Sequence, residues 1–279
     1  MEDQHYNGDI WNREAFALLK KFGWNRIGDY DMDVKGEDGK KMGIDTIVKF
    51  ETPLKAKPQL AVLEAKRYET KSFNKALLQD WIERLDKKLL KLRNSAPFVE
   101  KFPDADNCTI SDIGIIAIWF SDTDNYREFH SKFNEALNQV SVSTRTRRAG
   151  VNSIYVLDNT RFMRLFALQN AIDKEDGEYN FIYSPRYISG LPLTRQKALT
   201  IENIFSDIIF AEFKRGGETT SYIFYFGQLD LISFRFLRNA YSKTSLWDKG
   251  IKIILYVYDA DDEFRKIEND IKTDIFDGF

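Results

Sequence analysis

The segment from Ile113 to Phe120 is almost entirely apolar, and it restricts the fold more than any other part of the chain. It is far shorter than the roughly 18 apolar residues that a membrane-spanning helix needs. An apolar run of this length is typical of a strand that is buried on both faces of a sheet. We therefore expect an α/β protein in which other elements cover this strand on each side.

The segments before this strand alternate between helical and extended patterns. Apolar residues at helical spacing predict one helix over 11–22, ended by Gly23, and a longer one over about 74–92. Between them, β-branched and aromatic residues interrupted by turn residues predict three strands, over 24–34, 42–50 and 59–66. The predicted order is helix, three strands, helix, strand, which makes a compact α/β core.

The second half of the chain has weaker patterns. A helix is predicted over 126–140, and extended segments are predicted over 153–157, 161–168, 207–213, 221–226 and 251–258. The stretch 141–150 has the least regular pattern, and we place a domain boundary there. This gives a first domain over 1–140 and a C-terminal α/β region over 150–279, for which we expect an oligomer interface or a partner-binding surface.

Composition excludes several classes of protein. The chain has one cysteine and two histidines, so it has neither an intrachain disulfide nor the four Cys or His ligands of a structural zinc site. These features favour a cytoplasmic protein, and no apolar run is long enough to suggest a membrane protein. The 41 basic and 43 acidic residues give a net charge of −2, so any attraction for phosphate has to come from local basic clusters.

Four charged residues lie in or beside the first three predicted strands: Glu14, Asp45, Glu64 and Lys66. Glu64 and Lys66 are two apart in one strand, so their side chains share a face. Asp45 lies in the strand that we pair with it, where a suitable register brings its carboxylate close to Glu64. Glu14 lies at the margin of the apolar stripe of the first helix, which allows it to lean toward the sheet.

Carboxylates that converge in one cleft repel each other unless a cation is present, and oxygen ligands favour Mg²⁺ or Mn²⁺. We therefore predict a metal site formed by Asp45, Glu64 and Glu14. Such a metal lowers the pKa of a bound water and shields the charge of a phosphodiester. Lys66 would stabilise the attacking water or the developing charge, so the set predicts phosphodiester hydrolysis.

These residues resemble the signature of a known family. Gly43-Ile44-Asp45 followed by Leu63-Glu64-Ala65-Lys66 is similar to the motif of the PD-(D/E)xK nuclease superfamily, which has a restriction-endonuclease-like αβββαβ core. The upstream run from Arg13-Glu14-Ala15 to Phe22-Gly23-Trp24 resembles the leading helix of its Holliday-junction-resolvase and type IV restriction branches. The likeness covers residues 9–120, with Ile44 at the position of the motif's proline, which those branches often replace.

The resemblance implies an Mg²⁺-dependent endonuclease that acts on DNA. In that family the Asp and the Glu bind the metal, the Lys assists the water and the helix Glu can complete the metal shell. Those roles would belong to Asp45, Glu64, Lys66 and Glu14. Gln79 resembles a glutamine or lysine that some branches place beside the active site. By analogy alone, the resemblance also suggests a role in prokaryotic defence against foreign DNA.

Two basic clusters are candidates for contacts with a phosphate backbone. The first is a stripe on the helix after the third strand, formed by Arg84, Lys87, Lys88 and Lys91. The second is formed by Arg145, Arg147 and Arg148. An ordinary solvated helix face and an exposed loop without a ligand are the alternatives for the two clusters.

Other interpretations stay open at this point. An E-x-K triplet arises easily by chance among charged residues, and Glu64 and Lys66 would then form only a salt bridge. A rival triplet, Glu212-Phe213-Lys214, also follows an apolar strand, but it lacks a hairpin partner that carries an Asp. The chain could also be a non-catalytic nucleic-acid-binding or scaffolding subunit of a larger complex. An RNA-cleaving enzyme that uses His5 and His130 is disfavoured, because those residues lie in polar surroundings.

Overall fold

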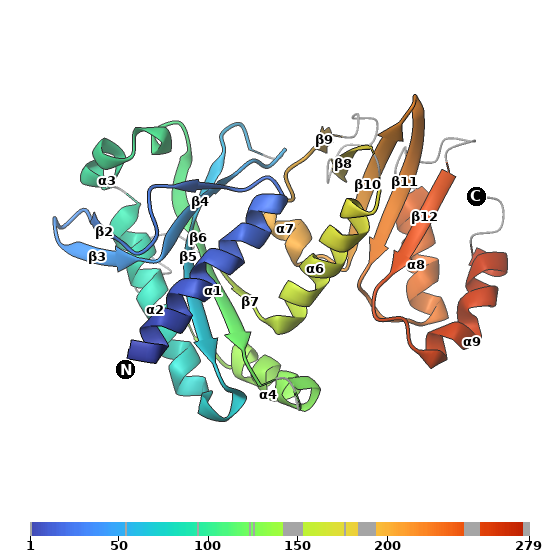
Figure 1. Ribbon diagram of the computed structural model, residues 1–279, viewed down its shortest axis with the longest axis horizontal. Helices are drawn as coiled ribbons and strands as arrows, with labels where there is room; N and C mark the ends of the chain where they lie inside the picture. The colour runs from blue at the N-terminus through green and yellow to red at the C-terminus, as the bar shows by residue number, and fades with distance from the viewer. Residues whose placement is uncertain are drawn as a thin grey trace. The chain divides into compact units, whose positions relative to one another are not determined.

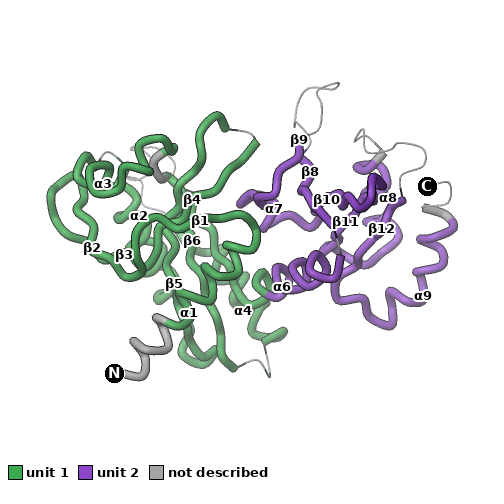
Figure 2. Tube along the Cα trace, turned by 45° about the horizontal axis from the view of Figure 1, so that its top comes forward, with its two compact units in different colours: residues 1–162 green, residues 163–279 purple. Residues whose placement is uncertain are grey.

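The computed structural model describes residues 2–53, 55–93, 95–122, 124, 126–141, 153–175, 177–183, 194–242 and 252–275 (Figure 1). The chain divides into two compact units, residues 1–162 and residues 163–279 (Figure 2). No helix in these described ranges is both long enough and apolar enough to cross a membrane.

The first unit is built on a five-stranded sheet with the order β1-β4-β5-β6-β7. The strands of this sheet are β1 (Asn25–Ile27), β4 (Thr46–Phe50), β5 (Gln59–Tyr68), β6 (Thr109–Phe120) and β7 (Ser153–Leu157). β4 is antiparallel to β1 and to β5, whereas β5, β6 and β7 run parallel. This arrangement, with the helices described next, confirms the predicted αβββαβ core.

Helices cover both faces of this sheet. α1 (Glu2–Lys21) lies on one face, where the Trp11 indole donates a hydrogen bond of 2.9 Å to the Ala117 carbonyl of β6. α2 (Lys75–Leu92) and α4 (Tyr126–Asn138) contribute to an apolar cluster that includes Val62 of β5 and Ile116 of β6. Ile116 and Ala117, neighbours that face opposite sides, are both fully buried, as expected for a strand covered on both faces.

The predicted hairpin over 24–50 is bent rather than straight. Its outer parts form the pair β1 and β4, and its inner parts form a separate hairpin of β2 (Met32–Lys35) and β3 (Lys41–Ile44). The bend lies at Asp31, which has a φ of 51°, and at Asp45, which separates β3 from β4. The Asp31 N–H donates to the Asp45 carbonyl at 2.8 Å, so the two breaks are held together. Asp45 therefore lies at a kink and not inside a strand.

The first unit extends past the predicted boundary at 140–150 because β7 pairs with β6. A short helix, α3 (Ala96–Lys101), precedes β6 and packs near β2. The segment 161–168, predicted to be extended, belongs instead to helix α6 (Asn159–Asp173). That prediction was wrong because the segment has a buried stripe at helical spacing, formed by Phe162, Leu165, Leu168 and Ile172.

The second unit has its own five-stranded sheet with the order β12-β11-β10-β8-β9. Its strands are β8 (Glu178–Tyr183), β9 (Thr194–Gln196), β10 (Ile208–Arg215), β11 (Glu218–Tyr225) and β12 (Lys252–Val257). α8 (Leu231–Ser242), α9 (Asp262–Asp270) and the turn of helix after it pack on one face through an apolar cluster that includes Ile223, Phe234 and Phe264. A short helix, α7 (Ile201–Ile204), joins β9 to β10.

Candidate active site

The kink at Asp45 is held by a buried asparagine on α1. Asn12 is only 1% exposed. Its side-chain amide donates one hydrogen bond of 3.1 Å to the Asp45 carbonyl and another of 3.3 Å to an Asp31 carboxylate oxygen. The hydroxyl of the next residue, Thr46, donates to the Asn12 side-chain oxygen at 2.7 Å. These bonds fix the backbone from which the Asp45 side chain projects.

The Asp45 carboxylate reaches the neighbouring strand β5. Its Oδ2 accepts a hydrogen bond of 2.9 Å from the backbone N–H of Ala65. The last ladder pair of the two strands is Thr46 with Leu63, so Asp45 and Glu64 are the next residues along each strand. This register brings the two carboxylates to the same end of the strand pair.

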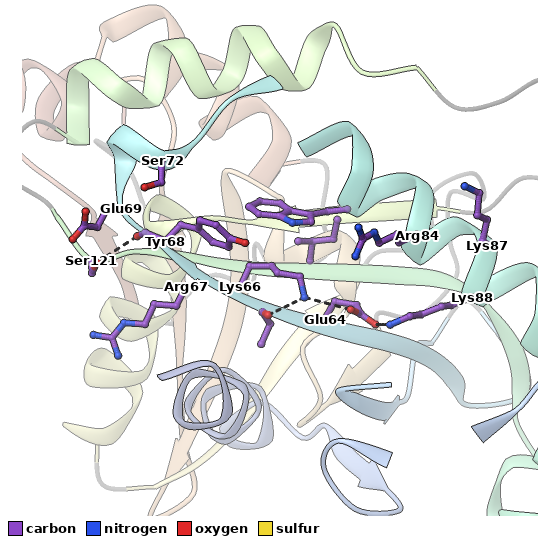
Figure 3. A pocket seen from close by; sticks show the side chains of 13 residues that line it. Glu64, Lys66, Arg67, Tyr68, Glu69, Ser72, Arg84, Lys87, Lys88 and Ser121 are labelled. Atoms are coloured by element: carbon purple, nitrogen blue, oxygen red, sulfur yellow. Dashed lines mark hydrogen bonds and ion pairs between the residues drawn. The ribbon is translucent and has the colours of Figure 1, made fainter. Parts of the chain in front are cut away.

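Lys66 joins these two carboxylates, and Figure 3 shows its contact with Glu64. Its Nζ lies 3.7 Å from Asp45 Oδ2 and 3.4 Å from Glu64 Oε2, and it donates to the Ala65 carbonyl at 3.1 Å. The Glu64 side chain is 10% exposed and that of Lys66 is 23% exposed. Glu64 is buried and needs a charge partner, which the partly buried Lys66 supplies.

A second lysine, Lys88 of α2, approaches Glu64 from the other side. Its Nζ lies 2.5 Å from Glu64 Oε1, while Lys66 contacts Oε2 (Figure 3). The two carboxylates of Asp45 and Glu64 are thus matched by two ammonium groups. The two ammonium groups balance the charge of two neighbouring carboxylates. A bound divalent cation would otherwise have this role.

A cavity of about 930 Å³ opens beside Glu64, Lys66 and Lys88, whereas Asp45 is not part of its lining. Trp81 and Ile116 contribute apolar surface to its wall. Its charged lining is mostly basic and consists of Glu64, Lys66, Arg67, Glu69, Arg84, Lys87 and Lys88 (Figure 3). An open cavity with a mostly basic lining suits an anionic polymer such as a nucleic acid.

The predicted basic stripe on α2 has mixed surroundings. Lys88 points into the site, whereas Arg84 pairs with Asp80 at 2.9 Å and Lys87 with Glu83 at 3.7 Å. Lys91 pairs with Asp38 at 3.1 Å, and this ion pair lowers the pKa of the Asp38 carboxyl. Arg84 and Lys87 still line the cavity with their charged ends, but Lys91 is not part of the lining. The second predicted cluster, formed by Arg145, Arg147 and Arg148, lies outside the described residues.

Two predicted site residues are not brought to the carboxylate pair. Glu14 is exposed on α1, because the residue that points to the sheet is Asn12, and two residues correspond to roughly 200° around a helix. The Gln79 amide donates to Glu83 at 3.0 Å and to the Ser141 carbonyl at 2.7 Å, so it ties α2 to the end of α4. Within the described ranges, no three acidic, His or Cys side chains gather in one metal-binding group.

The rival triplet on β10 is paired with basic side chains. Glu212 is 3% exposed and contacts Arg195 at 2.8 Å and Lys214 at 3.5 Å. Its ladder partners are Asn180 of β8 and Ser221 of β11, and neither contributes a second carboxylate.

Comparison with protein families gives a match to the part of the chain that contains the carboxylate pair. Residues 1–161 match the family described as the GAPS4 protein PD-(D/E)XK nuclease domain. The chain belongs to this nuclease family. Asp45, Glu64, Lys66 and Lys88 all lie inside the matched region, and Glu212 lies outside it. Neither the curated proteins nor the solved structures that were searched give a significant match.

Asn12 and the inward position of Lys88 were missed from the sequence. Asn12 follows Trp11 in the buried stripe of α1, so a polar residue beside that stripe was the available signal. Lys88 carries no comparable signal, because its spacing fits an exposed stripe as well as a buried position. Membership of the GAPS4 nuclease family confirms the PD-(D/E)xK superfamily, which the motif of Asp45, Glu64 and Lys66 predicted.

Proposed function

We propose that the chain is a metal-dependent nuclease that hydrolyses phosphodiester bonds of DNA. The observation that supports this most strongly is the convergence of Asp45 and Glu64 on Lys66, inside the region that matches the GAPS4 nuclease family; Glu64 and Lys66 also line a large basic cavity. A purely structural salt bridge would not need a cavity of about 930 Å³ over it.

The donor atoms suit Mg²⁺ or Mn²⁺. Asp45 and Glu64 offer carboxylate oxygens, and the Ala65 carbonyl faces the same ammonium group as both of them. Hard cations of this kind prefer carboxylate and carbonyl oxygens and keep several waters. When bound, such a cation supplies an activated water and neutralises charge on the phosphodiester.

The lysines have separate roles in this proposal. Lys66 lies between both carboxylates, where it can hydrogen-bond the attacking water or a phosphate oxygen and stabilise the negative charge that develops. Lys88 neutralises Glu64 while no substrate is present and can turn to a phosphate once Glu64 engages a cation. Arg84 and Lys87, farther along the cavity, would bind the backbone beside the scissile bond.

DNA as the substrate, and defence against foreign DNA as the biological role, are parts of the same proposal. The basic cavity supports a nucleic acid in general, and the likeness to restriction-type nucleases favours DNA. The role in defence rests on that family likeness. A partner protein, self-association and a cytoplasmic location stay predictions from the sequence.

The test is incubation of the full chain with supercoiled plasmid, linear duplex DNA, single-stranded DNA and RNA, each with Mg²⁺ and with EDTA. We expect cleavage of DNA in Mg²⁺ and none in EDTA. Cleavage of RNA alone would contradict the proposed substrate. DNA binding without any cleavage would favour the non-catalytic alternative.

A further inference from the structure

The second unit repeats the connections of the first. In the first unit, β4 is antiparallel to β1 and to β5, and α2 leads from β5 to the parallel strand β6. In the second unit, β10 is antiparallel to β8 and to β11, and α8 leads from β11 to the parallel strand β12. Four strands, β1-β4-β5-β6 in the first sheet and β8-β10-β11-β12 in the second, therefore have the same order and the same directions (Figure 1).

The elements around these strands correspond as well. A helix precedes each set, α1 in the first case and α6 in the second, and another helix follows each fourth strand, α4 and α9. Each unit also has an insertion between the first two of these four strands, that is, between β1 and β4 and between β8 and β10. The insertion is the β2 and β3 hairpin in the first unit, and β9 with α7 in the second.

The leading helices hold the corresponding turns. In the first unit, Asn12 of α1 binds the carbonyl of Asp45, the residue immediately before β4. In the second unit, Arg164 of α6 contacts the carboxylate of Asp207, the residue immediately before β10, at 2.9 Å. Arg164 also donates to the carbonyl of Phe226, the residue immediately after β11, at 2.8 Å. The two units thus share a helix-to-turn contact as well as a topology.

The pair of catalytic carboxylates is not shared. Asp207 has the place of Asp45 before its strand, but its carboxylate is paired with Arg164 of α6. In the first unit, Asp45 and Glu64 lie at the end of the strand pair, on the side that faces Lys88 of α2. On the side of the second sheet that faces α8, the same end of the strand pair is formed by Ile208 and Tyr225. Both belong to the apolar cluster with α8, and no carboxylate takes the place of Glu64.

The Glu212 triplet does not replace the missing site. Glu212 pairs with Ser221 in the middle of the ladder between β10 and β11, whereas Glu64 lies just beyond the last ladder pair of β4 and β5. Glu212 is therefore not at the end of its strand pair, where the proposed site of the first unit lies. Its Oε2 is paired with Arg195, and its Oε1, 3.5 Å from the exposed Lys214, has no hydrogen-bond partner among the described residues. Its ladder partners, Asn180 and Ser221, supply no second carboxylate with which it could share a cation.

We infer that the second unit is a repeat of the αβββαβ fold whose described residues form no active site, so that one chain carries one catalytic centre. This inference rests on the proposed nuclease function. One centre hydrolyses one phosphodiester bond at a time, so a double-strand break requires two successive events or two chains. Dilute protein should accordingly convert supercoiled plasmid to the nicked form before linear DNA accumulates.

The experiment compares the same substitution in both triplets, Glu64→Gln and Glu212→Gln. Nicking of supercoiled plasmid in Mg²⁺ and the number of Mn²⁺ ions bound per chain, measured by calorimetry, are the two readouts. We expect Glu64→Gln to lower the nicking rate at least about 100-fold and to remove the carboxylate-dependent Mn²⁺ site. Glu212→Gln should leave the nicking rate and the number of bound Mn²⁺ ions at the level of the unsubstituted chain. Lys214→Gln, at a side chain that is 53% exposed, gives the same comparison if Glu212→Gln does not fold.

Nicking or Mn²⁺ binding that survives in Glu64→Gln and disappears when Glu212→Gln is added would overturn the inference. Absence of cleavage by the unsubstituted chain would instead contradict the proposed nuclease function. In that case the calorimetric count still decides between one metal site per chain and two.

Discussion

At the scale of single residues, Lys88 is the feature with the most direct consequence for metal binding. Its ammonium contacts Glu64 Oε1, an oxygen that the proposed metal would use, so the lysine and the cation compete for the same carboxylate. We predict that Lys88→Gln increases the affinity for Mn²⁺ about 10-fold, equivalent to about 1.4 kcal/mol, while it slows DNA cleavage. Calorimetric titration of the folded protein measures the first effect.

Lys132→Gln is the matched control for this prediction. Lys132 also lies on a helix and pairs with a glutamate, at 3.4 Å, but it is 70% exposed and does not line the cavity. Its substitution should leave the affinity for Mn²⁺ unchanged. An affinity that stays the same in Lys88→Gln, or falls, would show that Lys88 does not compete with the cation.

At the scale of elements, the position of α2 depends on a glycine in β6. A Cβ atom at Gly114 would lie 2.7 Å from Leu85 Cδ2 and 3.1 Å from Leu89 Cδ1, so only glycine lets α2 pack this closely. We predict that Gly114→Val lowers the free energy of unfolding by about 1–3 kcal/mol through overpacking. Because α2 carries Lys88, the displaced helix should also change the affinity for Mn²⁺.

Gly43→Ala provides the control, since an added Cβ at Gly43 meets no atom within 4 Å. Urea unfolding should show a change within about 0.5 kcal/mol for this variant. Equal stabilities of the two variants would contradict the close packing of α2 on β6.

A second contact between elements predicts a dependence of stability on pH. Asp158 lies just before α6 and is 4% exposed; it accepts a hydrogen bond of 2.8 Å from Tyr126 and lies 3.0 Å from His130. Because Tyr126 and His130 belong to α4, these contacts join α4 to the start of α6. Burial by itself raises the pKa of Asp158, but the bonds from His130, Tyr126 and the Arg161 N–H outweigh it, so the pKa lies below its ordinary value of 3.8. The ionised carboxylate therefore stabilises the fold above pH 3.8, and this contribution is lost as the pH falls through the lowered pKa.

We predict that Asp158→Asn lowers the free energy of unfolding by about 1–3 kcal/mol at pH 7. The difference from the unsubstituted chain should shrink as the pH falls below 3.8, where the native carboxylate also loses its charge. Urea unfolding at several pH values measures it. A difference that is equally large at the lowest pH would mean that the charge of Asp158 does not contribute.

At the scale of the whole molecule, local pattern predicted the first unit better than the second. The apolar run of β6 and the amphipathic stripe of α2 determine where these elements pack, so their positions follow from periodicity. The bend at Asp31 and Asp45 could not be predicted in that way, because it depends on hydrogen bonds from Asn12, 33 residues before Asp45. The repeat in the second unit was also missed, since it is defined by strand pairing and not by a shared motif.

The candidate site shows the same limit. Alternation along β5 predicted that Glu64 and Lys66 share a face, and the pairing with β4 placed Asp45 beside them. The exposed position of Glu14 depends on the rotation of α1, which the margin of an apolar stripe defines only to within a residue or two. The inward turn of Lys88 depends on how closely α2 approaches the sheet.

The rate of duplex DNA cleavage in Mg²⁺ by the Asp45→Asn variant, relative to the unsubstituted chain, tests the central claim most directly. The asparagine can still accept the hydrogen bond from the Ala65 N–H, so circular dichroism should show an unchanged fold. We predict a rate at least about 100-fold lower, because one of the two carboxylates proposed to hold the metal is lost. Cleavage by folded Asp45→Asn protein at the rate of the unsubstituted chain would show that Asp45 and its neighbours are not the active site.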